Sequence, residues 1–457
     1  MTYQEALKFL NAFTNYEKAP KPLAMRWMKL ERMRHLCALL GDPQRAFRSI
    51  LVAGTNGKGS ICAMLYAMLQ QSTRRTGLYT SPHLKDLRER IRVWPLAGAD
   101  TSSAANDWIS EGDFSKAAAR VEQAVAIMRR GSRKETPTFF EILTACAFVH
   151  FEQQGVEIAV LEVGMGGRLD ATNVVDQAVS VIGPLGLDHT AVLGSDMPAI
   201  AKEKAGIIKP NQIVISAPQP EDVTEILRVS CEGNGVSLAI CGQDFDASIL
   251  AHDSNGLRLD VRGMRNTYRG VALSLIGRHQ AENAAVAVAA LEALSDAGSP
   301  HTLIERGLPQ AVWPGRIELV NESPTVMMDG AHNPQAAQAL AETLKEVLPN
   351  RRIHMLLGMS TDKDADGVAR ALGPLAASIT CTSSAHPRAL DPAALAERVK
   401  PYCSDVHVMA DCADASTYLL NAIDPSDVLL ITGSFFLVGA LRSSFTQART
   451  RRQAVAA

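Results

Sequence analysis

Near-continuous apolar runs alternate with amphipathic stretches along most of the chain. Four runs of strand length precede residue 185, at residues 50–53, 76–80, 156–163 and 178–182. Such uninterrupted apolar character is typical of parallel strands that are buried on both faces. Helical periodicity covers residues 61–70 and 139–153 between them. The alternation predicts a doubly wound α/β fold.

The pattern changes twice further along the chain. From about residue 235 to 276, short alternating segments such as 256–261 and 270–275 predict an antiparallel ribbon, and an Ala-rich helix over 281–294 follows. Strand-like runs then alternate with helices again, at 325–328, 353–358, 378–382, 406–409 and 428–432. We therefore predict an N-terminal domain over 1–312, a linker over 313–317 and a smaller Rossmann-like α/β domain over 318–457. The short basic tail, 449–457, is expected to be solvated or frayed.

Composition narrows the class of protein. Of the 457 residues, 47% are hydrophobic and 21% charged, and the net charge is −2, which fits a globular protein without an electrostatic footprint for nucleic acid or membrane. The eight cysteines are dispersed with no C-x-x-C pair, which indicates reduced core thiols rather than a disulfide framework or zinc site. Neither a secretory signal nor an apolar run long enough for a membrane span is present. We expect a cytoplasmic protein.

A glycine-rich turn follows the first predicted strand. It consists of Gly54, Thr55, Asn56, Gly57, Lys58, Gly59 and Ser60. Glycines let backbone N–H groups approach an anion, the following helix adds positive potential at its N-terminus, and the lysine contributes a charge. The strict P-loop spacing is not met, because the first glycine lies closer to the lysine and Gly59 separates lysine from hydroxyl. We interpret the turn as a variant phosphate-binding loop.

Polar residues also follow three other predicted strands. Ser81, Glu162 and His189 each lie just past a strand end. Ligands of open α/β sheets bind beyond the carboxyl ends of the strands, so these side chains are candidates for one pocket. A hydroxyl and a carboxylate suit Mg²⁺, whereas a histidine is an unusual ligand for it. Taken singly, the three are equally explained as a helix cap, an ion-pair partner and a loop histidine.

Candidate chemistry in the second half is less distinctive. Lys204 would ordinarily lie on a solvated helix face. The segment 329–334 (DGAHNP) has the alternative role of capping the helix that follows it. Arg316 would form a hinge ion pair or reach a γ-phosphate, for which a planar, always charged group is suited. Since no Ser-His-Asp order or nucleophile elbow is present, phosphoryl transfer is favoured.

Taken together, these segments resemble the folylpolyglutamate synthase family of the Mur-ligase superfamily, over nearly the whole chain. The resemblance rests on ten ordered motifs: GTNGKGS (54–60), YTSPHL (79–84), TFFE (138–141), LEVGMGGRLDATN (161–173), GLDHT (186–190), EKAGI (203–207), HQAENA (279–284), PGR (314–316), DGAHNP (329–334) and TGS (432–434). A lone phosphate loop would be far less specific.

The resemblance implies an ATP-dependent amide ligase. A substrate carboxylate would take the γ-phosphoryl group of ATP, and the amine of L-glutamate would then displace phosphate. ATP would be held by residues 54–60 and by Asn283, Arg316 and Asp329, the last two reaching across the domain cleft. Lys58, Lys204, Arg316 and His332 are the expected catalytic residues, and His332 and Ser434 match positions near the incoming glutamate.

Magnesium is the second cofactor that the resemblance implies. Ser81, Glu162 and His189 would hold Mg²⁺. Lys204 matches a lysine that is carbamylated in this family and ligates a second Mg²⁺. Carbamylation would turn a cation into an oxygen ligand that resembles a carboxylate.

The pterin side of the substrate also has candidates. Phe139 and Phe140 could present aromatic faces to a flat heterocycle, with helix core as the alternative. Asp170 or Glu141 could accept hydrogen bonds from its amino and ring N–H groups. With the segments that border the dihydropteroate site in the family, the expected set is Trp27, Met28, Lys29, Leu30, Thr138, Phe139, Phe140, Glu141, Leu169, Asp170 and Ala171.

The sequence leaves several functions open. The form GGRLDATN resembles bifunctional enzymes that also make dihydrofolate from dihydropteroate, so we expect both activities. The alternatives are a folylpolyglutamate synthase only, a Mur-type cell-wall ligase, or a nucleotide-dependent switch. TFFE and GGRLDATN argue against the cell-wall ligase, and a switch would leave DGAHNP and Arg316 without a role. We expect a monomer whose partners are small-molecule substrates.

Two departures from the family pattern are visible. Ile182-Gly183-Pro184-Leu185 replaces the usual approach to GLDHT, and Pro184 cannot donate a backbone hydrogen bond. Phe435 and Phe436 follow TGS where leucine and tyrosine are common, so a tyrosyl contact is missing.

Overall fold

The computed structural model describes residues 1–17, 29–94, 107–131, 136–188, 194, 196–294, 299–384 and 386–456, with side chains of the last helix described as far as Phe445. The chain forms two compact units. Unit 1 comprises Met1–Ser248, Leu259–Leu273 and Gln280–Val312, and unit 2 comprises Ile249–Arg258, Ser274–His279 and Trp313–Ala457. The sequence placed every residue up to 312 in the first domain, whereas two short segments before that point group with unit 2.

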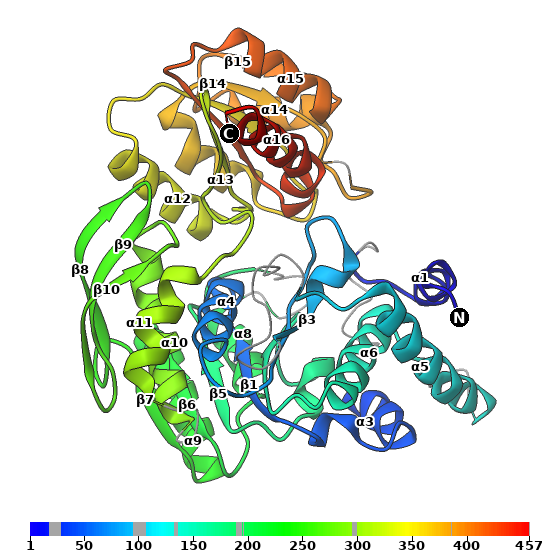
Figure 1. Ribbon diagram of the computed structural model, residues 1–457. Helices are drawn as coiled ribbons and strands as arrows, with labels where there is room; N and C mark the ends of the chain where they lie inside the picture. The colour runs from blue at the N-terminus through cyan, green and yellow to red at the C-terminus, as the bar shows by residue number, and fades with distance from the viewer. Residues whose placement is uncertain are drawn as a thin grey trace. The chain divides into compact units, whose positions relative to one another are not determined.

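A seven-stranded sheet forms the centre of unit 1 (Figure 1). Its strands, in the order β3-β2-β4-β1-β5-β6-β7, are β1 (Arg48–Ala53), β2 (Thr76–Tyr79), β3 (Ile91–Trp94), β4 (Ile158–Glu162), β5 (Val179–Ile182), β6 (Ile213–Ser216) and β7 (Ser237–Ile240). All neighbours are parallel except β2 and β3. Because β1 lies between β4 and β5, the loops that follow these three strands meet at the point where the strand order reverses, which is where open α/β sheets bind ligands.

The helices of unit 1 pack on this sheet or on one another. They are α1 (Tyr3–Asn11), α3 (Leu30–Leu39), α4 (Lys58–Leu69), α5 (Glu111–Gly131), α6 (Phe139–Gln153), α8 (Met197–Ala205), α9 (Glu221–Asn234), α10 (His279–Ala293) and α11 (Pro300–Gly307), with short 3₁₀ turns η2 (Pro43–Arg45), η3 (Leu87–Arg90), η6 (Ala171–Val174) and η7 (Leu308–Gln310). Helices α4 and α6 are buried almost all round, which explains why their apolar residues do not form a single stripe. The predicted helix over 139–153 is confirmed with the same bounds.

A three-stranded sheet with the order β10-β9-β8 follows in the chain: β8 (Asp246–Asp253), β9 (Gly256–Arg262) and β10 (Thr267–Leu273). Leu257, Leu259 and Val261 of β9 are buried, and Arg258 and Arg262 between and beyond them are exposed. This alternation is the pattern that predicted the ribbon. The first segment of the predicted ribbon differs, because β7 instead pairs parallel to β6 and extends the large sheet.

Unit 2 has its own six-stranded sheet, ordered β11-β12-β16-β13-β14-β15. The strands are β11 (Glu318–Glu322), β12 (Thr325–Met328), β13 (Ile353–Leu357), β14 (Ala376–Cys381), β15 (Val406–Val408) and β16 (Val428–Thr432), and only β11 is antiparallel to its neighbour. The helices are α12 (Pro334–Val347), α13 (Ala365–Leu372), α14 (Pro392–Val399), α15 (Cys412–Ala422) and α16 (Phe435–Ala456), with the 3₁₀ turn η8 (Gly373–Leu375). Helix α16 continues through the tail that we expected to be frayed.

The α/β fold class predicted from the sequence is thus confirmed for both units. The eight cysteines are unpaired, and all but Cys412 are buried, as expected of core thiols. Among the helices that the structure describes, none has both the length and the apolar character needed to cross a bilayer.

Candidate active site

The glycine-rich turn after β1 is held in place by the loop that follows β5. The backbone N–H groups of Thr55 and Asn56 donate to the carbonyl oxygen of Pro184, at 3.0 and 3.1 Å. The Thr55 hydroxyl donates to Gly186 O at 3.0 Å and accepts from Gly186 N at 3.1 Å. The absence of an N–H on Pro184 is therefore compatible with this loop geometry, because the loop uses the carbonyl oxygen of Pro184 as an acceptor.

Helix α4 begins at Lys58, three residues earlier than predicted, so its N-terminus lies in the turn itself. Gly57 precedes it with a φ of 75°, in the left-handed region that favours glycine. The Lys58 ammonium folds back over the turn and donates to Gly54 O at 3.1 Å and Thr55 O at 3.4 Å. A helix N-terminus, glycines and a lysine are thus together, as an anion site requires.

Asn283 of α10 lies directly against this turn. A Cβ on Gly57 would be 2.5 Å from Asn283 Oδ1, so only glycine fits there. The Asn283 amide donates to Gln280 Oε1 at 3.0 Å, while its buried Oδ1 has no hydrogen-bond partner. An unsatisfied buried acceptor carries a free-energy cost that a ligand can remove. The arrangement fits the predicted nucleotide contact.

Lys204 of α8 also points at the turn. Its side chain is only 4% exposed, and Nζ donates to Gly54 O at 2.8 Å. Burial, together with the nearby Lys58 ammonium, lowers the pKa of Lys204 to about 7. The sequence alone placed Lys204 on a solvated face, but the exposed lysine of this helix is Lys202. Two lysines therefore converge on a single carbonyl oxygen, although like charges repel.

Two of the three predicted magnesium ligands are adjacent. Glu162, the last residue of β4, is buried and accepts a hydrogen bond from Ser81 N at 3.0 Å. The third, His189, lies outside the described residues, as do Trp27 and Met28 of the predicted pterin set. Within the described ranges no group of three His, Cys, Asp or Glu side chains could hold a metal. A hydroxyl, a carboxylate and a carbamylated lysine would instead supply the oxygen donors that Mg²⁺ prefers.

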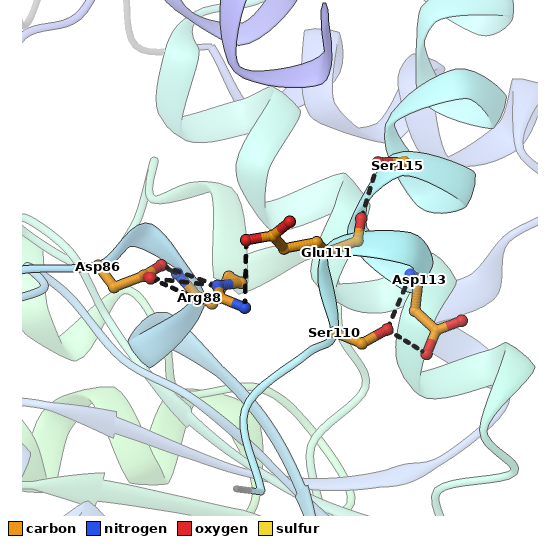
Figure 2. A network of polar contacts seen from close by, with 6 residues as sticks. All are labelled: Asp86, Arg88, Ser110, Glu111, Asp113 and Ser115. Carbon is orange, nitrogen blue, oxygen red and sulfur yellow. Dashed lines mark hydrogen bonds and ion pairs between the residues drawn. The ribbon is translucent and has the colours of Figure 1, made fainter. Parts of the chain in front are cut away.

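The segment 81–90, which carries Ser81, is organised by its own charged side chains. The backbone N–H groups of Leu84, Lys85 and Asp86 donate to the Glu89 carboxylate at 2.8, 3.0 and 2.8 Å. Arg88 pairs with Asp86 at 2.7 Å and lies 3.7 Å from Glu111 at the start of α5 (Figure 2). The segment is therefore fixed before any substrate arrives.

The two phenylalanines of TFFE differ in exposure. Phe139 is buried, in agreement with the helix-core alternative. Phe140 is partly exposed and covers Gly164, where a Cβ would lie 2.6 Å from Phe140 Cζ. Phe140 is the better candidate for contact with a flat ring.

Glu141 has structural partners for both carboxylate oxygens. Arg32 of α3 donates to them from Nε and Nη2 at 2.8–3.0 Å. Thr138 completes a capping box with Glu141 at the start of α6. The protein's own donors therefore occupy both carboxylate oxygens of Glu141, and this geometry does not support the prediction that Glu141 accepts hydrogen bonds from a pterin.

Asp170 is likewise engaged within its own loop. It accepts from Met165 N at 3.0 Å, from Thr172 N at 3.0 Å and from the Thr172 hydroxyl at 2.6 Å. Burial raises the pKa of Asp170. The residue shapes the loop that carries Leu169 and Ala171. Of the other predicted pterin residues, Lys29 is exposed and Leu30 is the buried first residue of α3.

In unit 2, Asp329 braces the linker. Its buried carboxylate accepts from Ile317 N at 3.0 Å and from Ala331 N at 2.7 Å. Burial raises the pKa of Asp329, against the opposing effect of Arg316. Ile317 has a φ of 46°, which is costly for a β-branched residue, so the hydrogen bond to Asp329 helps to hold a strained backbone.

Phe435 brings two predicted site residues of unit 2 together. The Arg316 guanidinium lies 4.3 Å from the centroid of the Phe435 ring, and the His332 ring meets it edge-on at 5.9 Å. His332 Nδ1 is 2.8 Å from Gly330 O, which makes Nδ1 the protonated nitrogen. Ser434 accepts from Phe436 N at 3.1 Å, and Asn333 caps α12. Phe435, which departs from the family pattern, thus contacts both Arg316 and His332.

Comparison with known proteins decides the family. Residues 52–291 match the Mur ligase middle domain, and residues 315–435 match the Mur ligase glutamate ligase domain. The dihydrofolate synthase/folylpolyglutamate synthase of Mycobacterium tuberculosis is 37% identical, over 91% of this chain and 90% of its own length. The chain belongs to the dihydrofolate synthase/folylpolyglutamate synthase family.

Solved structures of the synthase family agree with this assignment. The M. tuberculosis folylpolyglutamate synthase complexed with ADP and AMPPCP has a TM-score of 0.86 and 34% identity, over 97% of this chain and 98% of that one. E. coli FolC in complex with DHPP and ADP has a TM-score of 0.83 and 30% identity, over 98% of this chain and 99% of that one. The predicted family and enzyme class, an ATP-dependent ligase, are confirmed.

Sequence reasoning missed two residues of this synthase near Ser81. Arg90, which is buried, forms an ion pair with the partly exposed Glu17. Neither belongs to a motif with known chemistry, and the pairing joins residues 73 positions apart. No local signal in the sequence could have indicated it.

Proposed function

We propose that this synthase joins L-glutamate to dihydropteroate and to reduced folates, with ATP as the energy source. The observation that carries the proposal is the convergence of Lys58, Lys204 and the N-terminus of α4 on one turn, next to the Ser81–Glu162 pair. Its finer part, that both reactions occur, is supported by a relative named for both activities and by a neighbour solved with DHPP.

The chemistry is phosphoryl transfer followed by acyl transfer. A carboxylate oxygen of the folate-side substrate attacks the γ-phosphorus of ATP, and ADP leaves. The resulting acyl phosphate is attacked at carbon by the amine of glutamate, which loses a proton, and inorganic phosphate leaves. Lys58 and the N–H groups at the start of α4 neutralise the charge that spreads over the phosphates during the first step.

Magnesium fits the donor set of this site. When bound, Mg²⁺ supplies further charge neutralisation to the phosphates. Ser81, Glu162 and His189 are the proposed ligands for one ion. Lys204, once carbamylated, is the proposed ligand for another.

The lowered pKa of Lys204 supports the carbamylation. Only a neutral amine adds to CO₂, and a buried lysine with a pKa of about 7 is neutral in a large fraction of molecules near neutral pH. The product is anionic, which replaces the repulsion between Lys204 and Lys58 by attraction.

Residues of unit 2 have proposed roles in both steps. Arg316 and Asp329 are proposed nucleotide contacts, together with Asn283 of unit 1. His332 and Ser434 are proposed to contact the incoming glutamate. Asp329 also has a structural task, since it holds the backbone of the linker.

The partners, the oligomeric state and the cellular location complete the proposal. The partners of the synthase are small-molecule substrates, it acts as a monomer, and it resides in the cytoplasm. The domain limits 1–312 and 318–457, with a linker over 313–317, are proposed as its functional division.

One assay tests the function. Purified protein with ATP and Mg²⁺ is given L-glutamate and one acceptor at a time: dihydropteroate, a reduced folate or a UDP-muramoyl substrate. Phosphate release that depends on the first two acceptors is expected. Release without any acceptor would overturn the ligase proposal, and activity with reduced folate alone would remove the dihydrofolate synthase activity.

A further inference from the structure

Arg90, the last residue of η3, is a cation in the interior of unit 1. Its side chain is only 1% exposed, and it is the largest side chain of the structure's described part that is fully buried. Nη1 and Nη2 donate to the two carboxylate oxygens of Glu17, each at 2.7 Å, and Nε donates to His83 Nδ1 at 2.8 Å. A buried charge is costly unless its partners compensate it in this way.

The partners of Arg90 belong to segments that carry the site. Residues 14–17, which we call the N-terminal strap, contact three of them. Phe139 N of the TFFE segment donates to Thr14 O at 3.0 Å. Tyr16 packs against Ile200 of α8, as Met165 also does, and Glu17 binds Arg90. The Arg90 guanidinium also lies 6.0 Å from the centroid of the Phe139 ring. Arg90 therefore lies where the strap, TFFE and the Ser81 segment meet.

The hydrogen bond from Arg90 decides the tautomer of His83. A guanidinium is always protonated and has no acceptor, so His83 Nδ1 must offer its lone pair. The proton of the neutral ring is then on Nε2. A lysine could not reproduce the arrangement, because its single nitrogen lacks the planar fork that holds Nη1 and Nη2 against one carboxylate while Nε points at His83.

We propose that Arg90 is a positioning residue of the ligase site that acts through His83. It holds His83 in the Nε2–H tautomer and fastens the segment 81–90 to the N-terminal strap, so that Ser81 stays in place beside Glu162. The proposal rests on the proposed function, because that function makes Ser81 a ligand residue. The inference adds the contacts of Arg90 with Glu17 and His83, which keep the segment 81–90 in position.

Kinetics of three variants test this role. Arg90→Lys keeps the charge for Glu17 but loses the donor for His83, and we expect a KM for dihydropteroate raised by about 10-fold and a reduced kcat, as for a misplaced site. The Kd of ADP, measured by calorimetry, should change less than about 2-fold, because Arg90 does not touch the phosphate loop. Arg228→Lys, in exposed ion pairs of α9, is the matched control and should resemble the wild type.

The other two variants separate positioning from folding. Glu17→Gln weakens the ion pair at a residue that is partly exposed, so it remains measurable even where Arg90→Lys fails to fold. It should shift the KM for dihydropteroate in the same direction. His83→Asn places an amide oxygen where Nδ1 was and keeps the acceptor, but removes the Nε2–H. It should keep the melting temperature and lose activity, and full activity of this variant would show that Arg90 does not act through His83.

Tautomer spectra give a readout that is independent of ligase activity. Protein labelled with ¹⁵N at histidine, with the His83 signals assigned by their loss in His83→Asn, should show an unprotonated Nδ1 and a protonated Nε2. In Arg90→Lys the two tautomers should mix. A protonated Nδ1 in the wild type, or wild-type kinetics of Arg90→Lys, would overturn the proposal. A wild type without ligase activity would instead refute the proposed function and leave the spectroscopic test intact.

Discussion

Two lysines of unit 1, one half-buried and one buried, show how immediate partners decide the chemistry of a side chain. Lys209 has a pKa lowered to about 8 by burial, and its ammonium donates to Asn173 O, Val175 O and Gln177 Oε1 at 2.6–3.2 Å. Its three N–H groups are thus used by the protein. Lys204 has the lower pKa, about 7, and binds Gly54 O beside a second ammonium. Lys209 is a structural brace, whereas Lys204 is suited to reaction.

Paired substitutions of these lysines separate the two roles. Lys204→Ala should lower kcat by about 100-fold or more, because a proposed charge-neutralising group is lost, with little loss of stability. Lys209→Met should keep kcat but lower the free energy of unfolding by about 2 kcal/mol, since it leaves buried carbonyl oxygens without a donor. Steady-state kinetics and urea unfolding measure both. After equilibration with ¹³C-bicarbonate, a carbamate signal that persists in Lys204→Ala would contradict the assignment.

Lys58→Ala tests the phosphate loop. The variant loses the one side-chain cation of the turn, so we expect turnover to fall by about 1,000-fold, as for other groups that stabilise a phosphoryl-transfer transition state. Phosphate release with dihydropteroate and glutamate measures it. Lys202→Ala, which removes an exposed lysine of α8, is the control and should stay close to wild type. Near-normal turnover of Lys58→Ala would refute the loop assignment.

At the scale of elements, the sequence predicted best what local patterns determine. The bounds of α6 followed from its apolar run and from the Thr138–Glu141 capping box, which are both local. Strand β11 was missed, and β7 was assigned to the wrong sheet, because edge strands have only one neighbour to bury them. Motifs identified the candidate site residues. They did not show which other residues each side chain would face. Glu141 could not be known to face Arg32, which lies 109 residues away, nor Lys204 to face Gly54, 150 residues away.

The ion pair between α3 and α6 leads to a prediction about Glu141. Glu141→Gln leaves Arg32 buried beside a neutral amide, so we expect the free energy of unfolding to fall by about 3 kcal/mol. The double variant Arg32→Met/Glu141→Gln should recover more than half of that loss, since the uncompensated charge is gone. Urea unfolding measures both effects. If Glu141 is structural, the KM for dihydropteroate of the folded variant should stay near wild type, and a large increase would restore Glu141 to the pterin site.

Acid stability of α6 depends on His150. Its buried Nδ1 has no hydrogen-bond partner, and burial lowers the pKa of His150 to about 4 from an ordinary value of 6.5. Between these two pH values the unfolded chain binds a proton at His150 that the folded chain does not. The contribution of His150 to the free energy of unfolding therefore falls as the pH drops from 6.5 to 4, and below pH 4 this contribution is constant. The difference amounts to about 3 kcal/mol.

His150→Leu should remove this contribution. Unfolding free energies of unit 1 at pH 7 and pH 4 should differ less in His150→Leu than in the wild type. His407→Gln, at an exposed histidine of unit 2, is the control and should keep the wild-type dependence. An identical pH dependence of wild type and His150→Leu would contradict the prediction.

At the scale of the whole molecule, the two units have separate interiors. One core cluster runs from Ala6 to Cys231 within unit 1, and another from Ile276 to Leu430 within unit 2. The seven-stranded sheet lies wholly within unit 1, and the six-stranded sheet lies wholly within unit 2. Such an arrangement favours two unfolding transitions rather than one. The phosphate loop belongs to unit 1, so a nucleotide should act first on the transition of that unit.

Nucleotide binding should therefore stabilise the synthase unevenly. At an ADP concentration 100 times its Kd, with Mg²⁺ present, the unfolding free energy of unit 1 should rise by about 2.7 kcal/mol, because only the folded unit binds. Scanning calorimetry measures the shift, and hydrogen exchange should show new protection at residues 54–60. Chelation of Mg²⁺ should reduce the shift, and Lys58→Ala should abolish most of it while Lys202→Ala keeps it. A shift confined to unit 2, or one that Lys58→Ala leaves unchanged, would place the nucleotide elsewhere. The expected pattern would tie the imperfect glycine-rich turn to ATP through a measurement that needs no catalysis.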